Sequence, residues 1–258
     1  LTGADKLYDA VFKQYGVIRV QDYDELLEVS HLLANVRKPS NAGIAVVSHS
    51  GGISSLTADM LGQAGLDLPP LSAGACDGIN AILKNFGWAA NPADITGFAS
   101  GESFPQIMDY MINEPEVGTL VVASNGGGNQ IDHVINLRDR SQKGVAYFWT
   151  ASRTDDALAK LKSANVPVFY SPEKLAQGLK ALIDYHARRD RRRSDGPVSV
   201  PPLSAAQTQA LERLGASGGK SLSEKDSKQL IAEWGVAGTR EISVSSADAA
   251  VEAAHRIG

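Results

Sequence analysis

Four short, continuously apolar stretches run through the middle of the sequence, and segments with helical spacing separate and follow them. The apolar stretches cover residues 43–48, 119–124, 144–150 and 166–170. The helical segments are predicted at residues 53–64, 75–86, 103–113, 129–141, 154–164 and 172–187. Strands that are apolar throughout are typical of parallel sheets covered by helices on both faces. The sequence therefore predicts an α/β domain, a doubly wound parallel sheet in three layers, over residues 40–187.

Two glycine-containing loops follow predicted strands and open predicted helices, one at residues 48–52 and one at residues 125–129. Glycine lets the backbone approach a ligand closely, and a helix N-terminus presents free N–H groups with partial positive charge. Each loop is a candidate anion site; the alternative is a tight turn without a ligand. Neither carries the lysine of a P-loop or a dinucleotide fingerprint. The candidate residues are Ser50, Gly51, Gly52, Asn125, Gly126, Gly127 and Gly128.

A third loop has the sequence NPADITG and begins at Asn91. Pro92 restricts Asn91 to extended geometry, and the side chains of Asp94 and Thr96 can bond to the backbone of a turn. From these residues alone, a structured loop without a ligand is the favoured interpretation.

His49 lies between two serines in the first glycine loop. A catalytic triad requires an oriented acid partner, which a sequence does not show. We therefore interpret His49 as a loop histidine that bonds to backbone, and keep a role in the crevice open. No H-E-x-x-H motif or paired Cys-His spacing is present, so the sequence gives no support to a metal site.

Composition limits the class of protein further. The 258-residue chain has a formal net charge of −4, so its total charge favours neither nucleic acid nor an anionic membrane as a partner. Its single cysteine, Cys76, excludes an internal disulfide and fits a reducing compartment such as the cytoplasm. No apolar stretch approaches the ~20 residues of a membrane span. Because the sequence starts at Leu1 without a signal-peptide pattern, we expect a piece of a longer protein.

The segment before the first strand is predicted to hold a helix at residues 4–15 and a short strand at residues 17–20. Asp22 and Glu25 then form a capping-box-like pair at the start of a second helix, in which apolar residues repeat at helical spacing. Prolines and polar residues end that pattern near residue 39.

An arginine-rich stretch begins at Arg188 and becomes rich in proline and serine. It is interpreted as a solvated linker over residues 188–222, with phosphate or nucleic-acid binding as the alternative. Ser223 is predicted to cap a helix, an extended stretch follows, and Ser246 is predicted to cap another helix. A unit of this kind over residues 223–258 is too small to bury a core alone, so we expect the first part of a truncated domain.

Four segments in order resemble the NDP-forming (ADP-forming) acyl-CoA synthetases, the superfamily of succinyl-CoA synthetase. They are GVIRVQDYDELLEVSHLL, GIAVVSHSGGISSLTADMLGQAGLDLPPLS, NPADITG and LSEKDSKQLIAEWGV. The resemblance covers nearly the whole chain and implies a flavodoxin-like fold for residues 40–187, as the second ligase domain. It implies that residues 1–38 end the preceding ligase domain and that residues 223–258 begin an ATP-grasp domain.

The resemblance also implies an activity for the full-length protein: acid, CoA and ATP give acyl-CoA, ADP and phosphate through an acyl phosphate and a phosphohistidine. CoA, ATP and Mg²⁺ serve that enzyme, and its neighbouring domains bring the carboxylic acid, CoA and nucleotide. The phosphohistidine is expected upstream of Leu1, and none of the five histidines matches it. The chain alone is therefore expected to be inactive and to bind no cofactor, and the whole protein to be a homo-oligomer.

Family likeness gives each loop a role. It implies that residues 125–128 supply a helix N-terminus to the phosphate, that Asn91 contacts the substrate carboxylate, and that residues 50–52 shape the crevice. Two alternatives remain. One is a non-catalytic sensor domain fused to a protein acetyltransferase, and the other is a stand-alone binding module.

Overall fold

The computed structural model describes residues 2–84, 86–96, 103–126, 129–194, 200–216, 218–219 and 221–258. The chain divides into two compact units, Leu1–Gly196 and Pro197–Gly258, which are described separately. The glycines Gly127 and Gly128 of the second predicted loop lie outside the described residues.

The first unit is built on a five-stranded parallel sheet with the order β2-β1-β3-β4-β5. Its strands are β1 (Gly43–Ser48), β2 (Ala93–Asp94), β3 (Val117–Ser124), β4 (Gly144–Trp149) and β5 (Val168–Phe169). The described part of this unit confirms the predicted doubly wound α/β fold. The two-residue strand β2 lies inside the NPADITG loop and was not predicted, because so short a strand leaves no apolar run in the sequence.

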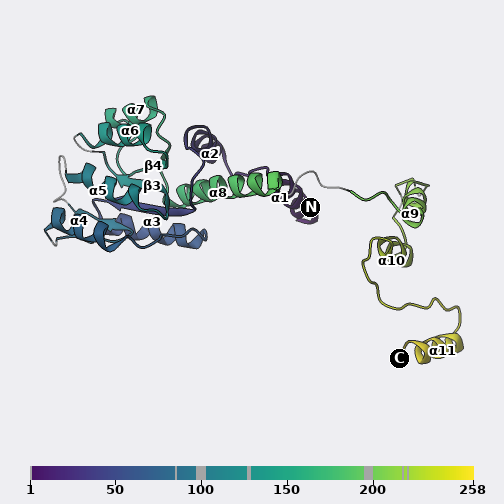
Figure 1. Ribbon diagram of the computed structural model, residues 1–258. Helices are drawn as coiled ribbons and strands as arrows, with labels where there is room; N and C mark the ends of the chain where they lie inside the picture. The colour runs from purple at the N-terminus through teal and green to yellow at the C-terminus, as the bar shows by residue number, and fades with distance from the viewer. Residues whose placement is uncertain are drawn as a thin grey trace. The chain divides into compact units, whose positions relative to one another are not determined.

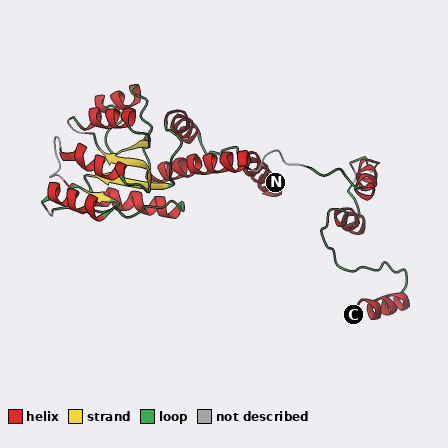
Figure 2. Cartoon of the chain, viewed as in Figure 1, coloured by secondary structure: helices red, strands yellow, loops and turns green. Residues whose placement is uncertain are grey.

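Helices cover both faces of the sheet, which makes the three layers visible in Figures 1 and 2. One face carries α4 (Ala73–Leu83), α5 (Ser103–Asn113), α6 (Gln130–Arg140) and α7 (Asp156–Ser163). The other carries α2 (Tyr23–Asn35), α3 (Gly51–Gln63) and α8 (Pro172–Ser194). Alternate residues of β1 point to opposite faces: Ala45 and Val47 enter the first core, and Ile44 and Val46 enter the second. Every residue of β1, β3 and β4 is buried, as the apolar runs predicted.

The strand order reverses between β1 and β3. From β1 the chain moves outward to β2, and it then returns to place β3 on the other side of β1. The helices that follow these two strands diverge, because α3 packs on one face through Leu61 and α6 packs on the other through Ile131 and Val134. This switch point is where open α/β sheets bind ligands, beyond the carboxyl ends of the strands.

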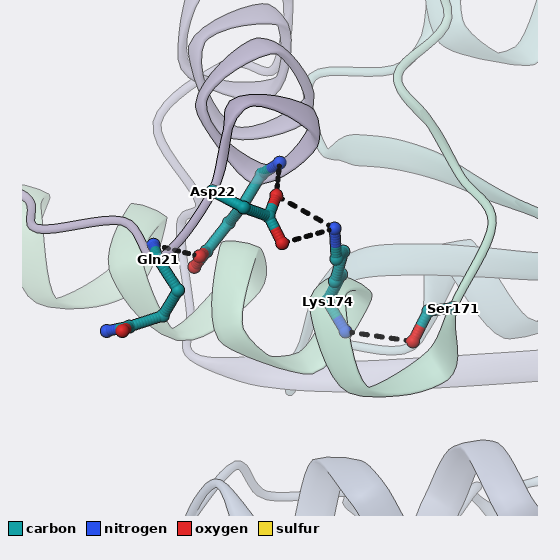
Figure 3. A network of polar contacts seen from close by, with 5 residues as sticks. Gln21, Asp22, Ser171 and Lys174 are labelled. Atoms are coloured by element: carbon teal, nitrogen blue, oxygen red, sulfur yellow. Dashed lines mark hydrogen bonds and ion pairs between the residues drawn. The ribbon is translucent and has the colours of Figure 1, made fainter.

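The segment before β1 lies within the same compact unit as the sheet. After α1 (Thr2–Tyr15), residues 17–20 form no strand. Helix α2 buries Leu32 and Val36 in the same core as β1 and α8. Figure 3 shows the start of α2, where Asp22 caps the helix and binds Lys174 of α8 through both carboxylate oxygens at 2.9 Å.

The predicted linker from Arg188 is also different in the structure. Helix α8 continues to Ser194, and a further helix, α9 (Ala205–Ala216), lies within residues 188–222. Arginine is a good helix former, and positive charge is favourable in the last turn of a helix, where Arg191, Arg192 and Arg193 lie. The charged run therefore extends a helix instead of ending it.

In the second unit, α9, α10 (Glu224–Ala232) and α11 (Ala247–Ile257) are short. Ser223 and Ser246 cap α10 and α11 through their side chains, as predicted. Residues 236–244 form no strand. Ala210 and Ala253 are the buried apolar residues among those described, so this unit has almost no core of its own.

Candidate functional site

The two glycine loops lie side by side at the switch point. Strands β1 and β3 are neighbours, with Ser48 paired to Ala123 at their carboxyl ends. His49 links the two loops because its Nδ1 atom lies 3.3 Å from the Oγ atom of Ser124. Its ring also stacks on Phe104 of α5, with the ring centroids 4.7 Å apart. His49 is a loop histidine, and one of its partners is the Ser124 hydroxyl.

Ser124, the last residue of β3, organises the second loop. It is buried, and its hydroxyl oxygen accepts a hydrogen bond from the Gly126 N–H at 3.3 Å. The same hydroxyl donates to Oε1 of Gln130, the first residue of α6, at 3.3 Å. The sequence analysis missed Ser124 and Gln130; the one signal was a polar residue at the end of an apolar strand. Through these bonds, Ser124 joins the end of β3 to the start of α6.

Tyr147 of β4 lies under the same loop and is fully buried. Burial raises the pKa of its phenol well above the ordinary value, an effect that the nearby Ser124 and Gly126 partly offset. The phenol is therefore neutral at any physiological pH. In the sequence, Tyr147 lies within a continuous apolar run, and nothing there indicated that its phenol lies under the glycine loop.

Gly126 has a geometry that other residues tolerate poorly. Its φ angle is +71°, in the left-handed region, and a Cβ atom there would lie 2.5 Å from the Trp149 ring. Glycine is therefore required at this point of the loop. Asn125, which precedes it, is exposed at the mouth of the crevice.

The N-terminus of α6 differs from the side-chain-capped helix starts of this unit. Asn129 occupies the N-cap position but makes no side-chain bond to the first turn among the described residues. Uncapped N–H groups of a first helical turn are the donors that phosphate and carboxylate groups use.

The N-terminus of α3, on the other side of the switch point, is already occupied from within the chain. The Ser50 hydroxyl accepts the Ile53 N–H at 3.5 Å. A Cβ atom on Gly51 would lie 2.6 Å from Oδ2 of Asp94, so that carboxylate lies against the first turn. Asp94 also accepts the Thr96 N–H at 3.0 Å, which is the turn bond predicted for it. Ser50 and Gly51 are therefore placed at the crevice, but they face a carboxylate of this chain.

The side chain of Asn91 forms hydrogen bonds with backbone groups. Its Oδ1 atom accepts the Val46 N–H at 3.0 Å, and its Nδ2 atom donates to the carbonyl oxygens of Ile44 at 2.7 Å and Pro69 at 3.0 Å. Both amide N–H groups are engaged by these contacts, which tie the loop to β1. This is the structured-loop alternative, and the geometry leaves no free Asn91 donor for a substrate carboxylate.

Two other kinds of site are not seen in the described part of the chain. Its histidine, cysteine and acidic side chains form no group of three that would hold a metal ion. No helix there is long and apolar enough to cross a membrane.

The five-stranded parallel sheet with a glycine loop after each central strand defines the fold class as doubly wound α/β. Sequence comparison finds that the chain is similar to ligases named as ADP-forming acyl-CoA ligases. It is 23% identical over 265 residues to the ADP-forming 4-hydroxybutyrate–CoA ligase of Nitrosopumilus maritimus, covering 100% of this chain and 38% of that protein. It is 28% identical over 223 residues to the ADP-forming acetate–CoA ligase I of Archaeoglobus fulgidus, covering 85% of this chain and 32% of that protein.

Among solved structures, the fold is similar to a dinucleotide-forming acetyl-coenzyme A synthetase from Ca. Korarchaeum cryptofilum, in complex with phosphate and ADP. The TM-score is 0.67 at 19% identity, over 76% of this chain and 44% of that one. The chain thus spans less than half the length of each of these relatives. No family model matches it.

Proposed function

We propose that the chain is part of an NDP-forming acyl-CoA synthetase, in which it supplies the N-terminus of α6 to the phosphate site. The observation that carries this proposal is the position of α6, which begins beside a glycine loop at the carboxyl end of a central strand and whose N-cap residue Asn129 makes no side-chain cap bond. The ligases named among the relatives support the activity.

In the proposed reaction, acid, CoA and ATP give acyl-CoA, ADP and phosphate through an acyl phosphate and a phosphohistidine. A phosphate group carries up to two negative charges, and the free N–H groups of a helix start favour it without a bulky side chain in the way. This chain contributes no group that forms or breaks a bond. Its contribution is to hold the phosphate between chemical steps, while CoA, ATP and Mg²⁺ bind through other domains of the synthetase.

The residues around the loop would keep those donors in place. Ser124 fixes the Gly126 N–H and the side chain of Gln130, and Trp149 packs under Gly126. The loop backbone is therefore oriented before the ligand arrives, which is how a preorganised site stabilises developing charge. We assign the phosphate contacts to Asn125, Gly126, Gly127 and Gly128 together with the first turn of α6.

The organisation of the parent protein follows from the same proposal. Residues 40–187 are the second ligase domain, and residues 1–38 end the preceding one while packing on this sheet. The second unit, with its scarcity of buried residues, is the start of an ATP-grasp domain that needs more chain to complete a core.

The proposal is tested on the full-length protein. It is incubated with ATP and Mg²⁺, and acid-labile, base-stable phosphate on histidine is measured, followed by its discharge with a carboxylic acid and CoA. Phosphorylation that is discharged only when both are present supports a synthetase. A folded protein that binds CoA but is never phosphorylated would contradict the catalytic proposal and favour a sensor domain of a protein acetyltransferase.

A further inference from the structure

A separate cavity of about 400 Å³ lies at the β5 edge of the sheet, away from the switch point. Helix α2 forms one wall with Leu27, Glu28 and His31, and Tyr170 at the end of β5 forms another. Arg153, from the loop after β4, and Lys162, at the end of α7, complete it. The proposed phosphate site uses none of these residues.

Two positively charged side chains of this cavity lie near the same aromatic ring, that of Tyr170. The Arg153 guanidinium carbon lies 4.2 Å from the centroid of the Tyr170 ring, and the Lys162 Nζ atom lies 5.5 Å from it. Neighbouring lysines are paired, Lys160 with Asp132 and Lys174 with Asp22, whereas Arg153 and Lys162 belong to no ion pair among the described residues. The charge of Arg153 acts on the nearby Glu28 carboxylate, but neither cation is held in an ion pair within the described ranges, so both are well placed to receive an anion.

The acidic side of the cavity is only partly charged. Burial raises the pKa of the half-buried Glu28 to about 7, with Lys174 opposing that rise. Near neutral pH, Glu28 is therefore only partly ionised, and Asp24 is the other carboxylate in the lining. The two full positive charges thus outweigh the negative charge. The Glu28 Oε2 atom and the Tyr170 hydroxyl are both buried and have no hydrogen-bond partner in the described part of the chain.

The walls of the cavity are held by other contacts. Asp22 binds Lys174, and the Gln21 N–H donates to the Glu25 carboxylate at 2.5 Å, so the start of α2 is fixed against α8 (Figure 3). Val29 and Leu32 bury the inner face of α2. The cavity is therefore bounded by packed elements, and small-molecule sites are usually formed before the ligand binds.

We propose that this cavity binds a small organic anion with a flat apolar body. The anionic group pairs with Arg153 and Lys162, and the apolar body lies against Leu27 and the Tyr170 ring. The inference does not depend on the proposed synthetase activity, because it concerns a different edge of the sheet.

Benzoate is the probe, and benzylamine is its control, since the two have the same shape and opposite charge. Binding to the full chain is measured by isothermal titration calorimetry and by the shifts of backbone amides in NMR spectra. We expect millimolar or tighter binding of benzoate, with shifts at Tyr170 and in α2, and at least roughly tenfold weaker binding of benzylamine.

The substitution Arg153→Met keeps the length of the side chain but removes its charge, and we expect it to weaken benzoate binding about tenfold. Lys160→Met is the matched control, because Lys160 lies on α7 but outside the cavity and pairs with Asp132; binding should be unchanged. The proposal is overturned if benzoate fails to bind, if benzylamine binds better, or if Arg153→Met binds normally. It is also overturned if inorganic phosphate competes as strongly as benzoate, because the apolar body would then contribute nothing.

Discussion

The N-termini of α3 and α6 have the same position in the fold but opposite local chemistry. Each follows a central strand, each lies at the switch point, and each is preceded or opened by glycine. At α3, the Ser50 hydroxyl and the Asp94 carboxylate already face the first turn. At α6, Asn129 makes no side-chain cap. One helix start thus has a side-chain cap and a neighbouring carboxylate from within the chain, and the N-cap residue of the other makes no side-chain cap bond.

Under the proposed function, this difference accounts for a phosphate at the start of α6 and none at the start of α3. A helix N-terminus attracts anions wherever it occurs, so selectivity requires that the unwanted position be filled. Asp94 fills it with a carboxylate, which would also repel a phosphate that approached α3. His49 lies between the two positions and contacts the α6 side through Ser124.

The largest expected effect is on phosphate transfer, when one glycine in each of the two loops is replaced by valine. In the full-length protein, Gly127→Val should nearly abolish phosphate transfer, because a branched side chain would occupy the place of the phosphate. The measurement is the amount of phosphohistidine formed from ATP, together with the thermal stability of the variant. Gly52→Val is the control, since the nearest atom to a Cβ there is 4.0 Å away. Wild-type transfer in Gly127→Val would remove α6 from the phosphate site.

A smaller effect is expected on the free energy of unfolding, when one glycine in each of the same loops is replaced by alanine. Gly126→Ala should lower the free energy of unfolding by about 2 kcal/mol, because it combines a left-handed backbone with a contact to Trp149. Gly52→Ala should leave stability unchanged or raise it by up to about 1 kcal/mol, since alanine is the better helix former. Urea denaturation of both variants checks this. Equal effects at the two positions would mean that the loops do not differ in backbone geometry.

The residue between the two loops should matter less. We expect His49→Asn to slow turnover by less than tenfold, under about 1.4 kcal/mol of barrier, because His49 stacks and bonds beside the site without transferring phosphate. Steady-state kinetics of the full-length enzyme measure this. A loss above roughly a thousandfold would place His49 in the chemistry.

The sequence predicts those features of the fold that depend on residues close together in the chain. Apolar runs and helical spacing predicted all the central strands and their helices, because both patterns are local. The position of both loops at the switch point was not predicted, because it depends on the order of the strands in the sheet, which the structure supplies. The helices within residues 188–222 were not predicted, because charge alone does not distinguish a solvated linker from an exposed helix end.

The difference between the two helix starts was not predictable, because it depends on residues distant in sequence. Asp94 lies against Gly51 but belongs to another loop. The side-chain amide of Asn91 forms hydrogen bonds with the backbone of Ile44 and Val46 in β1. Ser124 and Tyr147 meet only when β3 and β4 pair. Nothing local to any of these residues reveals its partner.

The smallest expected effect is on stability, when the N-cap residue of α3 or of α6 is replaced by alanine. Ser50→Ala removes the hydroxyl that accepts the Ile53 N–H, and it should cost about 1 kcal/mol of stability. Asn129→Ala should cost nearly nothing, since Asn129 makes no side-chain cap to lose. Chemical denaturation of the two variants in parallel, without phosphate, measures the difference. If Asn129→Ala proves as costly as Ser50→Ala, then the start of α6 is capped in solution, and a ligand would have to displace that cap before it could bind.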